Sequence, residues 1–232
     1  MPESDPSAER ERLATAVKEA GGIALKFFGG QFQKWTKGTG DSPVTEADIA
    51  ANDLLHRRLV APGDGWLSEE SENDPSRLQA RRVWVVDPID GTRAFIAGRE
   101  DWSISAALVI AGRPVLAALY APVTDEMFMA TTGEGAVRNG DPILASMGNG
   151  LDGARVAHGT LDAAVAGGSG HDWDLAAADL LVHEAGGMIT ALDGKALVYN
   201  RPDPVHGMLI AAGRERHGAL VDLIRAQTSE PA

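Results

Sequence analysis

The sequence contains no cysteine in its 232 residues. Disulfide bonds, thiolate metal sites and a cysteine nucleophile are therefore excluded. The metal ligands that remain are carboxylates, imidazoles and carbonyl oxygens, a set that favours hard cations. If this chain binds a metal, we expect Asp and Glu oxygens to hold it.

Long apolar runs and a signal-like N-terminus are also missing, so we expect a cytoplasmic protein without a membrane span. Basic excess is missing as well. The formal net charge is −12, and the basic clusters are short runs such as 56–58 and 81–82. A surface that tracks nucleic-acid phosphates is therefore not expected. An acidic protein that handles a phosphorylated small molecule would need cations to bridge the two.

The stretch Val83–Phe95, with the sequence VWVVDPIDGTRAF, places two acids just after a strand. Its first four residues are typical of a buried strand. Pro88 prevents a regular ladder, and Asp90-Gly91 favours a turn, so we expect a sharp bend. A helix opening after Gly91 would aim amides outward as an anion site. The alternative for this string alone is a polar turn.

Hydrophobic spacing predicts a mixed α and β chain. The predicted helices cover about 7–27, a segment starting near 45, a segment starting near 174, and 214–226. The predicted strands cover 66–67, 83–86, 103–109, 115–120, 126–130, 188–191, 196–199 and 208–212. A Gly-rich stretch at about 145–159 predicts two lobes, an N-terminal α+β lobe of 1–144 and a smaller C-terminal lobe of 145–232.

Carboxylates recur at the ends of these elements. They are Asp48, Glu69 or Glu70, Asp87 with Asp90, and Asp174. Each has a structural alternative, since Asp48 fits a capping box with Thr45, Asp174 fits a helix cap, and adjacent glutamates often form a solvated face. If the fold gathers them, like charges ~4 Å apart cost about 4 kcal/mol at an effective dielectric near 20. Divalent cations remove that cost.

Four motifs in this order resemble the inositol monophosphatase family of lithium-sensitive, Mg²⁺-dependent phosphatases. They are DSPVTEAD (41–48), LSEES (67–71), WVVDPIDGTRAF (84–95) and WDLAAADLLVHEAGG (173–187). The wider family includes 3′(2′),5′-bisphosphate nucleotidases and histidinol phosphatases. The resemblance implies a layered αβαβα sandwich, here with a reduced C-terminal lobe. It also implies two or three Mg²⁺ ions, inhibition by Li⁺, and homodimers, which are common in the family.

The resemblance also implies metal ligands at matching positions. Glu69 would be shared by the first and third metals, and Asp87 would bridge the first and second. The carbonyl of Ile89 would complete the first site, while Asp90 and Asp174 would hold the second. Asp174 would also contact the substrate.

Further roles follow from the same resemblance. Asp48 and the Thr92 hydroxyl would orient the attacking water, and the amides of Gly91 and Thr92 would cradle the phosphate. Arg93 suits a second negative group on the substrate, with a surface arginine as its alternative. Two residues would support the site, Glu70 beside Glu69, and Lys37, whose alternative is a solvated loop lysine.

These roles predict hydrolysis of a small phosphate monoester by direct attack of a metal-activated water, without a phosphoenzyme. Inositol is not expected as the specific alcohol, because Gly167 stands roughly where inositol-specific enzymes carry an acid. A 3′(2′),5′-bisphosphate nucleotidase or a histidinol phosphatase is an alternative within the class. A catalytically inactive homologue that only binds metal and phosphate is the alternative outside this class of enzymes. His171, His183 and His206 lack compact zinc spacing and are expected in loops or on helix surfaces.

Overall fold

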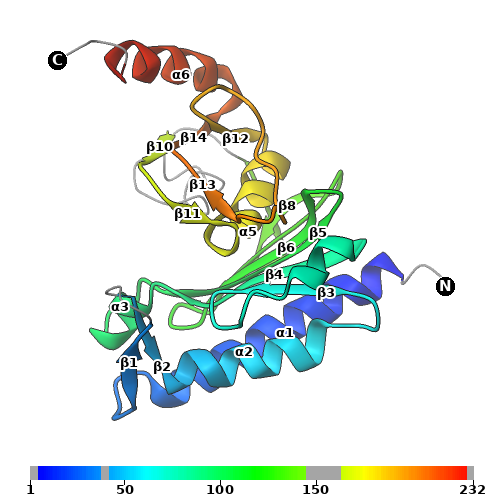
Figure 1. The fold of residues 1–232 in the computed structure, drawn as a ribbon, viewed down its shortest axis with the longest axis vertical. Coiled ribbons are helices and arrows are strands. Elements are labelled where there is room, and N and C mark those ends of the chain that lie inside the picture. The colour runs from blue at the N-terminus through cyan, green and yellow to red at the C-terminus, as the bar shows by residue number, and fades with distance from the viewer. Residues whose placement is uncertain (1–4, 38–41, 145–162, 229–232) are drawn as a thin grey trace.

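The computed structural model describes residues 5–37, 42–144 and 163–228. Its layers form an αβαβα sandwich (Figure 1). Helices α1 (Pro6–Phe27) and α2 (Glu46–Leu59) cover one face of a large sheet, and α5 (Asp172–Glu184) covers the other. A smaller sheet then packs on α5, and α6 (Arg214–Thr228) closes the stack. The predicted fold class is confirmed.

The large sheet has seven strands in chain order. Its first pair is parallel and the others are antiparallel. Because helices cover both faces, the central strands are apolar on both sides. On β4, Val83 and Val85 face the α5 side, whereas Trp84 and Val86 face α1 and α2. The strands are β3 (Gly65–Ser68), β4 (Arg82–Asp90), β5 (Ser103–Ile110), β6 (Arg113–Ala121), β7 (Glu126–Thr131), β8 (Gly135–Arg138) and β9 (Asp141–Ile143).

The smaller sheet has the order β10-β14-β12 and lies beyond α5. Its strands are β10 (Ala163–Ala166), β12 (Gly187–Ala191) and β14 (Leu209–Gly213). Two-stranded pairings join β1 (Lys34–Thr36) to β2 (Pro43–Thr45) and β11 (Gly170–His171) to β13 (Val205–His206). No helix in the described ranges is long and apolar enough to cross a membrane.

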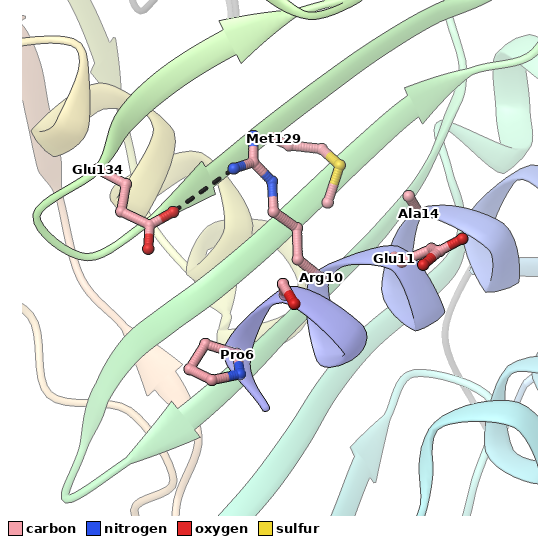
Figure 2. A pocket seen from close by; sticks show the side chains of 7 residues that line it. Pro6, Arg10, Glu11, Ala14, Met129 and Glu134 are labelled. Atoms are coloured by element: carbon pink, nitrogen blue, oxygen red, sulfur yellow. Dashed lines mark hydrogen bonds and ion pairs between the residues drawn. The ribbon is translucent and has the colours of Figure 1, made fainter. Parts of the chain in front are cut away.

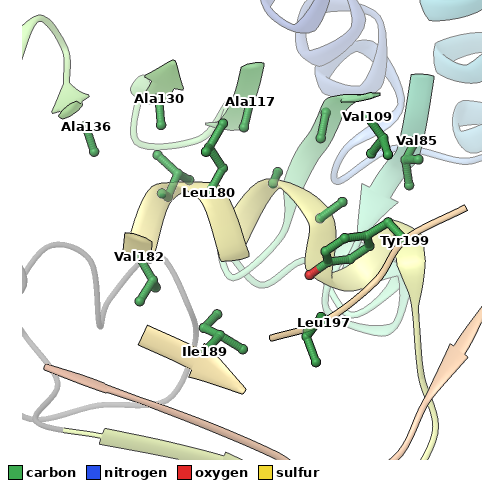
Figure 3. Close-up of a cluster of buried hydrophobic side chains, with 14 of the residues drawn as sticks. Val85, Val109, Ala117, Ala130, Ala136, Leu180, Val182, Ile189, Leu197 and Tyr199 are labelled. Atoms are coloured by element: carbon green, nitrogen blue, oxygen red, sulfur yellow. The ribbon is translucent and has the colours of Figure 1, made fainter. Parts of the chain in front are cut away.

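Helix α5 shares one hydrophobic core with both sheets (Figure 3). Leu180 of α5 packs with Ala117 and Ala130 of the large sheet, and Ile189 of β12 belongs to the same cluster. The two predicted lobes therefore meet in a common core. The Gly-rich stretch 145–159, on which the predicted lobe boundary rests, lies outside the described residues, so that boundary stays a prediction.

Some predicted elements differ from the structure. The strand predicted at 196–199 is wrong, because this extended segment joins no sheet although Leu197 and Tyr199 are buried. Periodicity does not distinguish a core-lining extended segment from a strand. The predicted strands do not include β1, β2, β8 to β11 or β13. Helix α5 begins at Asp172, two residues earlier than expected.

The end of β4 carries the predicted bend. Asp87 pairs with Ser105 and Asp90 with Ser103, so three steps on β4 match two on β5, which makes a β-bulge. Gly91 follows with φ +93° and caps the short helix α3 (Thr92–Ile96). A Cβ at Gly91 would lie 2.8 Å from the carbonyl oxygen of Asp101. Only glycine fits here, for both its φ and its size.

We predict that Gly91→Ala destabilises the fold by more than Gly133→Ala. Gly133 also has positive φ, at +79°, but no atom lies within 4 Å of its added Cβ. The control therefore measures the backbone cost alone, about 1 kcal/mol. Urea unfolding of both variants checks the difference, and equal losses would show that the Asp101 carbonyl simply moves aside.

A buried carboxylate on α5 predicts a pH effect on stability. Asp179 is fully buried, and its Oδ1 lies 2.8 Å from Nδ1 of His183. The hydrogen bond to Asp179 raises the pKa of His183, against desolvation and the charge of Arg113. The folded pKa thus exceeds the unfolded value of about 6.5. The stabilisation is complete below that value and is lost as the pH rises through the raised pKa.

Replacing His183 tests this effect. In His183→Gln we expect a smaller loss of unfolding free energy between pH 6 and pH 9 than in the wild type, measured by urea unfolding. The comparison cancels groups that titrate identically in both proteins. An unchanged pH dependence would contradict the assignment.

Candidate metal and phosphate site

Acidic side chains from four elements gather at one edge of the large sheet. β3 and β4 are adjacent and parallel, with Ser68 opposite Val86, so Glu69, just after β3, lies beside Asp87, near the end of β4. Asp87 is 2% exposed. Burial raises its pKa well above the usual range, and the charges of Asp90, Glu69, Asp174 and Asp48 raise it further. The structure therefore brings the predicted acids together.

Asp48 is on the first turn of α2 and is fully buried. It forms the predicted capping box, with Oδ2 accepting hydrogen bonds from Thr45 N at 2.9 Å and Thr45 Oγ1 at 2.5 Å. Its other oxygen lies 3.3 Å from Oγ1 of Thr92. Burial raises the pKa of Asp48. One oxygen of Asp48 thus caps α2, while the other faces Thr92 at the start of α3.

The residues of the β-bulge and the start of α3 lie next to Asp48 and Asp87. Asp87 Oδ1 accepts a hydrogen bond from Ile89 N at 3.0 Å, and the Ile89 carbonyl lies 3.1 Å from Thr92 Oγ1. Thr92 is 8% exposed. Within the described part of the chain, the amides of Gly91 and Thr92 donate to no protein acceptor. Arg93 is exposed on the first turn of α3.

Lys37 fixes the two adjacent glutamates. Its Nζ donates to the carbonyl of Glu69 at 2.7 Å and lies 2.6 Å from Glu70 Oε1. Its distance to Glu69 Oε1 is 3.8 Å. Burial raises the pKa of Glu70 to about 7, although Lys37 opposes the shift. Lys37 is thus not a solvated loop lysine, and Glu70 is not part of a solvated face.

Asp174 reaches the cluster from α5, on the opposite face of the large sheet from α2. It is on the first turn of α5, and its Oδ2 accepts a hydrogen bond from His171 N at 2.7 Å. Burial raises its pKa, while that hydrogen bond opposes the shift. The ring of His171 stacks on Trp173 at 4.5 Å. Asp174 is therefore not the N-cap, which is His171, but the N3 residue of a capping box, and it adds charge to the cluster.

The donor chemistry of the cluster fits Mg²⁺, which takes carboxylate, carbonyl and water oxygens. In the described residues, however, no group of three or more His, Cys, Asp or Glu side chains is already arranged to hold a metal ion. Asp48, Asp87 and Asp174 instead accept hydrogen bonds from nearby protein donors. The buried carboxylates of Asp48 and Asp87 and the half-buried carboxylate of Asp174 fit a cation, but side-chain rotation would have to complete the coordination.

Two surface hollows lie away from these acids. One, of about 340 Å³, lies between the start of α1 and the large sheet (Figure 2). Arg10 reaches across it to Glu134 at 3.5 Å. The other, of about 320 Å³, lies along α1 near Arg58. Neither contains a residue of the acidic cluster.

One histidine expectation is wrong. His206 is 7% exposed rather than on a surface, and its Nε2 lies 2.7 Å from Asp172 Oδ1. Sequence reasoning also missed the buried Arg77 and the half-buried Asn200, which hydrogen-bond to each other although they are far apart in the sequence. No local pattern signals these residues, because their partners are far away in sequence.

A model of the inositol monophosphatase family matches residues 7–154 and 144–229 of this chain. A 3′-phosphoadenosine 5′-phosphate phosphatase of Mycobacterium tuberculosis is 34% identical, over 74% of this chain and 76% of its own length. A Streptomyces griseus protein is 36% identical, over 79% of this chain and 86% of its own length. That protein is named glucose-1-phosphate thymidylyltransferase, a nucleotidyltransferase name, whereas the family and the mycobacterial protein are phosphatases.

Solved structures agree with the family match. The extragenic suppressor protein SuhB of Bartonella henselae superposes with a TM-score of 0.81 at 25% identity. The alignment covers 93% of this chain and 97% of that protein. The prediction of a phosphoric monoester hydrolase is confirmed at the level of the family. With its motifs, its layers and this match over nearly the whole length, the chain belongs to the inositol monophosphatase family of phosphatases.

Proposed function

We propose that this protein hydrolyses a small phosphate monoester in a Mg²⁺-dependent reaction. The observation that carries the proposal is the acidic cluster at the end of β4, where burial and four neighbouring carboxylates raise the pKa of Asp87. Such a cluster is costly unless cations neutralise it. Asp48 and Thr92 beside it supply a carboxylate and a hydroxyl for handling water.

The ligands proposed for two or three Mg²⁺ ions are Glu69, Asp87, the Ile89 carbonyl, Asp90 and Asp174. Bound Mg²⁺ would make a coordinated water more acidic and neutralise charge on the phosphoryl oxygens. Lys37 and Glu70 support this set, because Lys37 holds the backbone of Glu69 and is paired with Glu70. Inhibition by Li⁺ belongs to the same proposal.

Asp48 and Thr92 are proposed to orient the attacking water. Thr92 has one hydroxyl proton, and both Asp48 Oδ1 and the Ile89 carbonyl lie within reach of it. When Thr92 donates to Ile89, its oxygen and Asp48 can both accept from water. The amides of Gly91 and Thr92 would donate to the phosphate.

A 3′(2′),5′-bisphosphate is the substrate class with the most support. Arg93 is an exposed cation beside the proposed phosphate position, where it suits a second phosphate. The relative from Mycobacterium tuberculosis is named for such a substrate. Gly167 offers no acid for a sugar hydroxyl. Histidinol phosphate is the second candidate, and a silent binding homologue is the alternative outside catalysis. A cytoplasmic location and a homodimer remain part of the proposal.

Asp90→Asn tests the metal chemistry. Removing this charge should lower Mg²⁺-dependent phosphate release at least about 100-fold, because metal catalysis is worth several kcal/mol. Asp53→Asn, on the exposed side of α2, is the control and should keep the wild-type rate. An unchanged rate in Asp90→Asn would remove Asp90 from the mechanism, and a wild type that releases no phosphate would favour the binding homologue.

Arg93→Ala tests the substrate class. We expect KM for adenosine 3′,5′-bisphosphate to rise about 10-fold, since hydrogen bonds to charged groups are worth ~1.5–3 kcal/mol. KM for inositol 1-phosphate, which lacks a second phosphate, should change little. Steady-state assays with both substrates and with histidinol phosphate check this. An equal rise for both substrates would contradict a role in recognising the second phosphate.

A further inference from the structure

The first residue of α5 is held by a segment from far along the chain. The side chain of Asp172 is fully buried. Its Oδ2 accepts a hydrogen bond from Asn200 N at 2.6 Å, and its Oδ1 lies 2.7 Å from His206 Nε2. Its backbone N donates to the Pro204 carbonyl at 2.9 Å. The segment 200–206 thus contacts the start of α5 at three points.

The same segment is tied to the N-terminal lobe through Arg77. Arg77 lies on the short 3₁₀ helix η1 (Pro75–Gln79) and is 2% exposed. Its guanidinium donates to Asn200 Oδ1 and, at 2.9 Å, to the Arg201 carbonyl. Asn200 Nδ2 donates back to the Arg77 carbonyl at 3.4 Å. Arg77 and Asn200 therefore form a reciprocal link between the two lobes.

Arg77 is itself anchored close to the predicted metal ligands. Its Nε donates at 2.8 Å to Asn73, which lies on the loop that follows Glu69 and Glu70. The backbone of η1 packs on β3, because a Cβ at Gly65 would lie 3.1 Å from Arg77 Cα. The four residues Asp172, His206, Asn200 and Arg77, named here the lobe link, thus join the loop after Glu69 to the start of α5.

The lobe link holds the start of α5, which carries Asp174, next to the other acids of the cluster. Asp174 lies on the first turn of α5, two residues after Asp172. Glu69 and Asp87 lie at the ends of β3 and β4, and α5 packs on this sheet, so Asp174 faces like charges across that contact and is repelled by them. The lobe link holds the start of α5 against this repulsion through hydrogen bonds, of which the one between His206 and Asp172 is buried and the others are part-buried.

We propose that the lobe link positions Asp174 for cation binding across the two lobes. Its members are positioning residues, since none contacts the predicted ligand oxygens. Loss of the link would leave α5 folded but would let Asp174 retreat, so that cation binding must first draw it back. The expected consequence is weaker Mg²⁺ affinity, with near-normal turnover once Mg²⁺ saturates. This inference rests on the proposed Mg²⁺ dependence.

Asn200→Gly and Arg77→Lys test the link without changing net charge. Asn200 has φ +56°, which glycine adopts freely, so this variant keeps the N–H for Asp172 and removes only the contact to Arg77. Lysine cannot reproduce the forked bonds of Arg77. His217→Gln is the matched control, because His217 is 4% exposed in the same lobe and bonds Thr190 and Ile210 instead.

Each variant is assayed for Mg²⁺ binding by calorimetry without substrate, for the Mg²⁺ concentration that gives half-maximal phosphate release, for kcat at saturating Mg²⁺, and for Tm. We expect Asn200→Gly and Arg77→Lys to weaken Mg²⁺ binding about 10-fold, the size of effect known for residues that orient ligands. Their kcat at saturation should stay within about 3-fold of the wild type. His217→Gln should lower Tm and leave Mg²⁺ binding unchanged.

The outcomes separate this inference from the proposed function. Wild-type Mg²⁺ affinity in Asn200→Gly overturns the lobe link, even if Arg77→Lys does not fold. Equal weakening in His217→Gln also overturns it, because a general loss of stability would then be the cause. A wild type that binds Mg²⁺ but releases no phosphate refutes the phosphatase proposal, and calorimetry still decides the link. A wild type that binds no Mg²⁺ overturns both.

Discussion

The repulsion among buried carboxylates at one sheet edge is the constraint on which the rest of the structure depends. Asp48, Glu69, Asp87 and Asp174 come from separate elements. Burial raises the pKa of each, and the charges of other acids in the cluster raise the pKa of Glu69 and Asp87 further. Folding brings them together because large apolar cores lie on both sides of the sheet. The free energy gained by packing these two cores thus offsets the electrostatic cost of bringing the charges together.

Several local devices hold this arrangement. Asp48 and Asp174 each accept a backbone hydrogen bond at the start of their helix, and Lys37 draws the two glutamates toward itself. Each device satisfies a carboxylate with a protein donor while leaving it near its neighbours. The acids are therefore held close together but not fully arranged for a cation, which agrees with a site that a metal completes.

Much of this site was predictable because its signals are local. The strand, Pro88 and the Asp90-Gly91 turn follow one another in sequence, and the Thr45–Asp48 capping box spans four residues. The contacts of Arg77 with Asn200 join residues 123 apart, and no periodicity records such a pairing. The segment 196–199 misled the prediction because an extended chain that packs into a core has the same apolar pattern as a strand. The burial of His206 could not be predicted from the sequence, because it depends on its partner Asp172, which is 34 residues away in the chain.

The bulge in β4 changes which face of the sheet the residues after it point to. In a regular strand, residues three apart point to opposite faces, so Asp87 and Asp90 would be separated by the sheet itself. Their partners Ser105 and Ser103 are two apart and share a face, so the extra residue turns both acids to the side of α5. Without the bulge, the same spacing of three residues would place one of the two acids among the aromatic and aliphatic side chains on the α1 side of the sheet. The spacing of the two acids, together with the bulge between them, therefore determines that both carboxylates lie on the same face of the sheet.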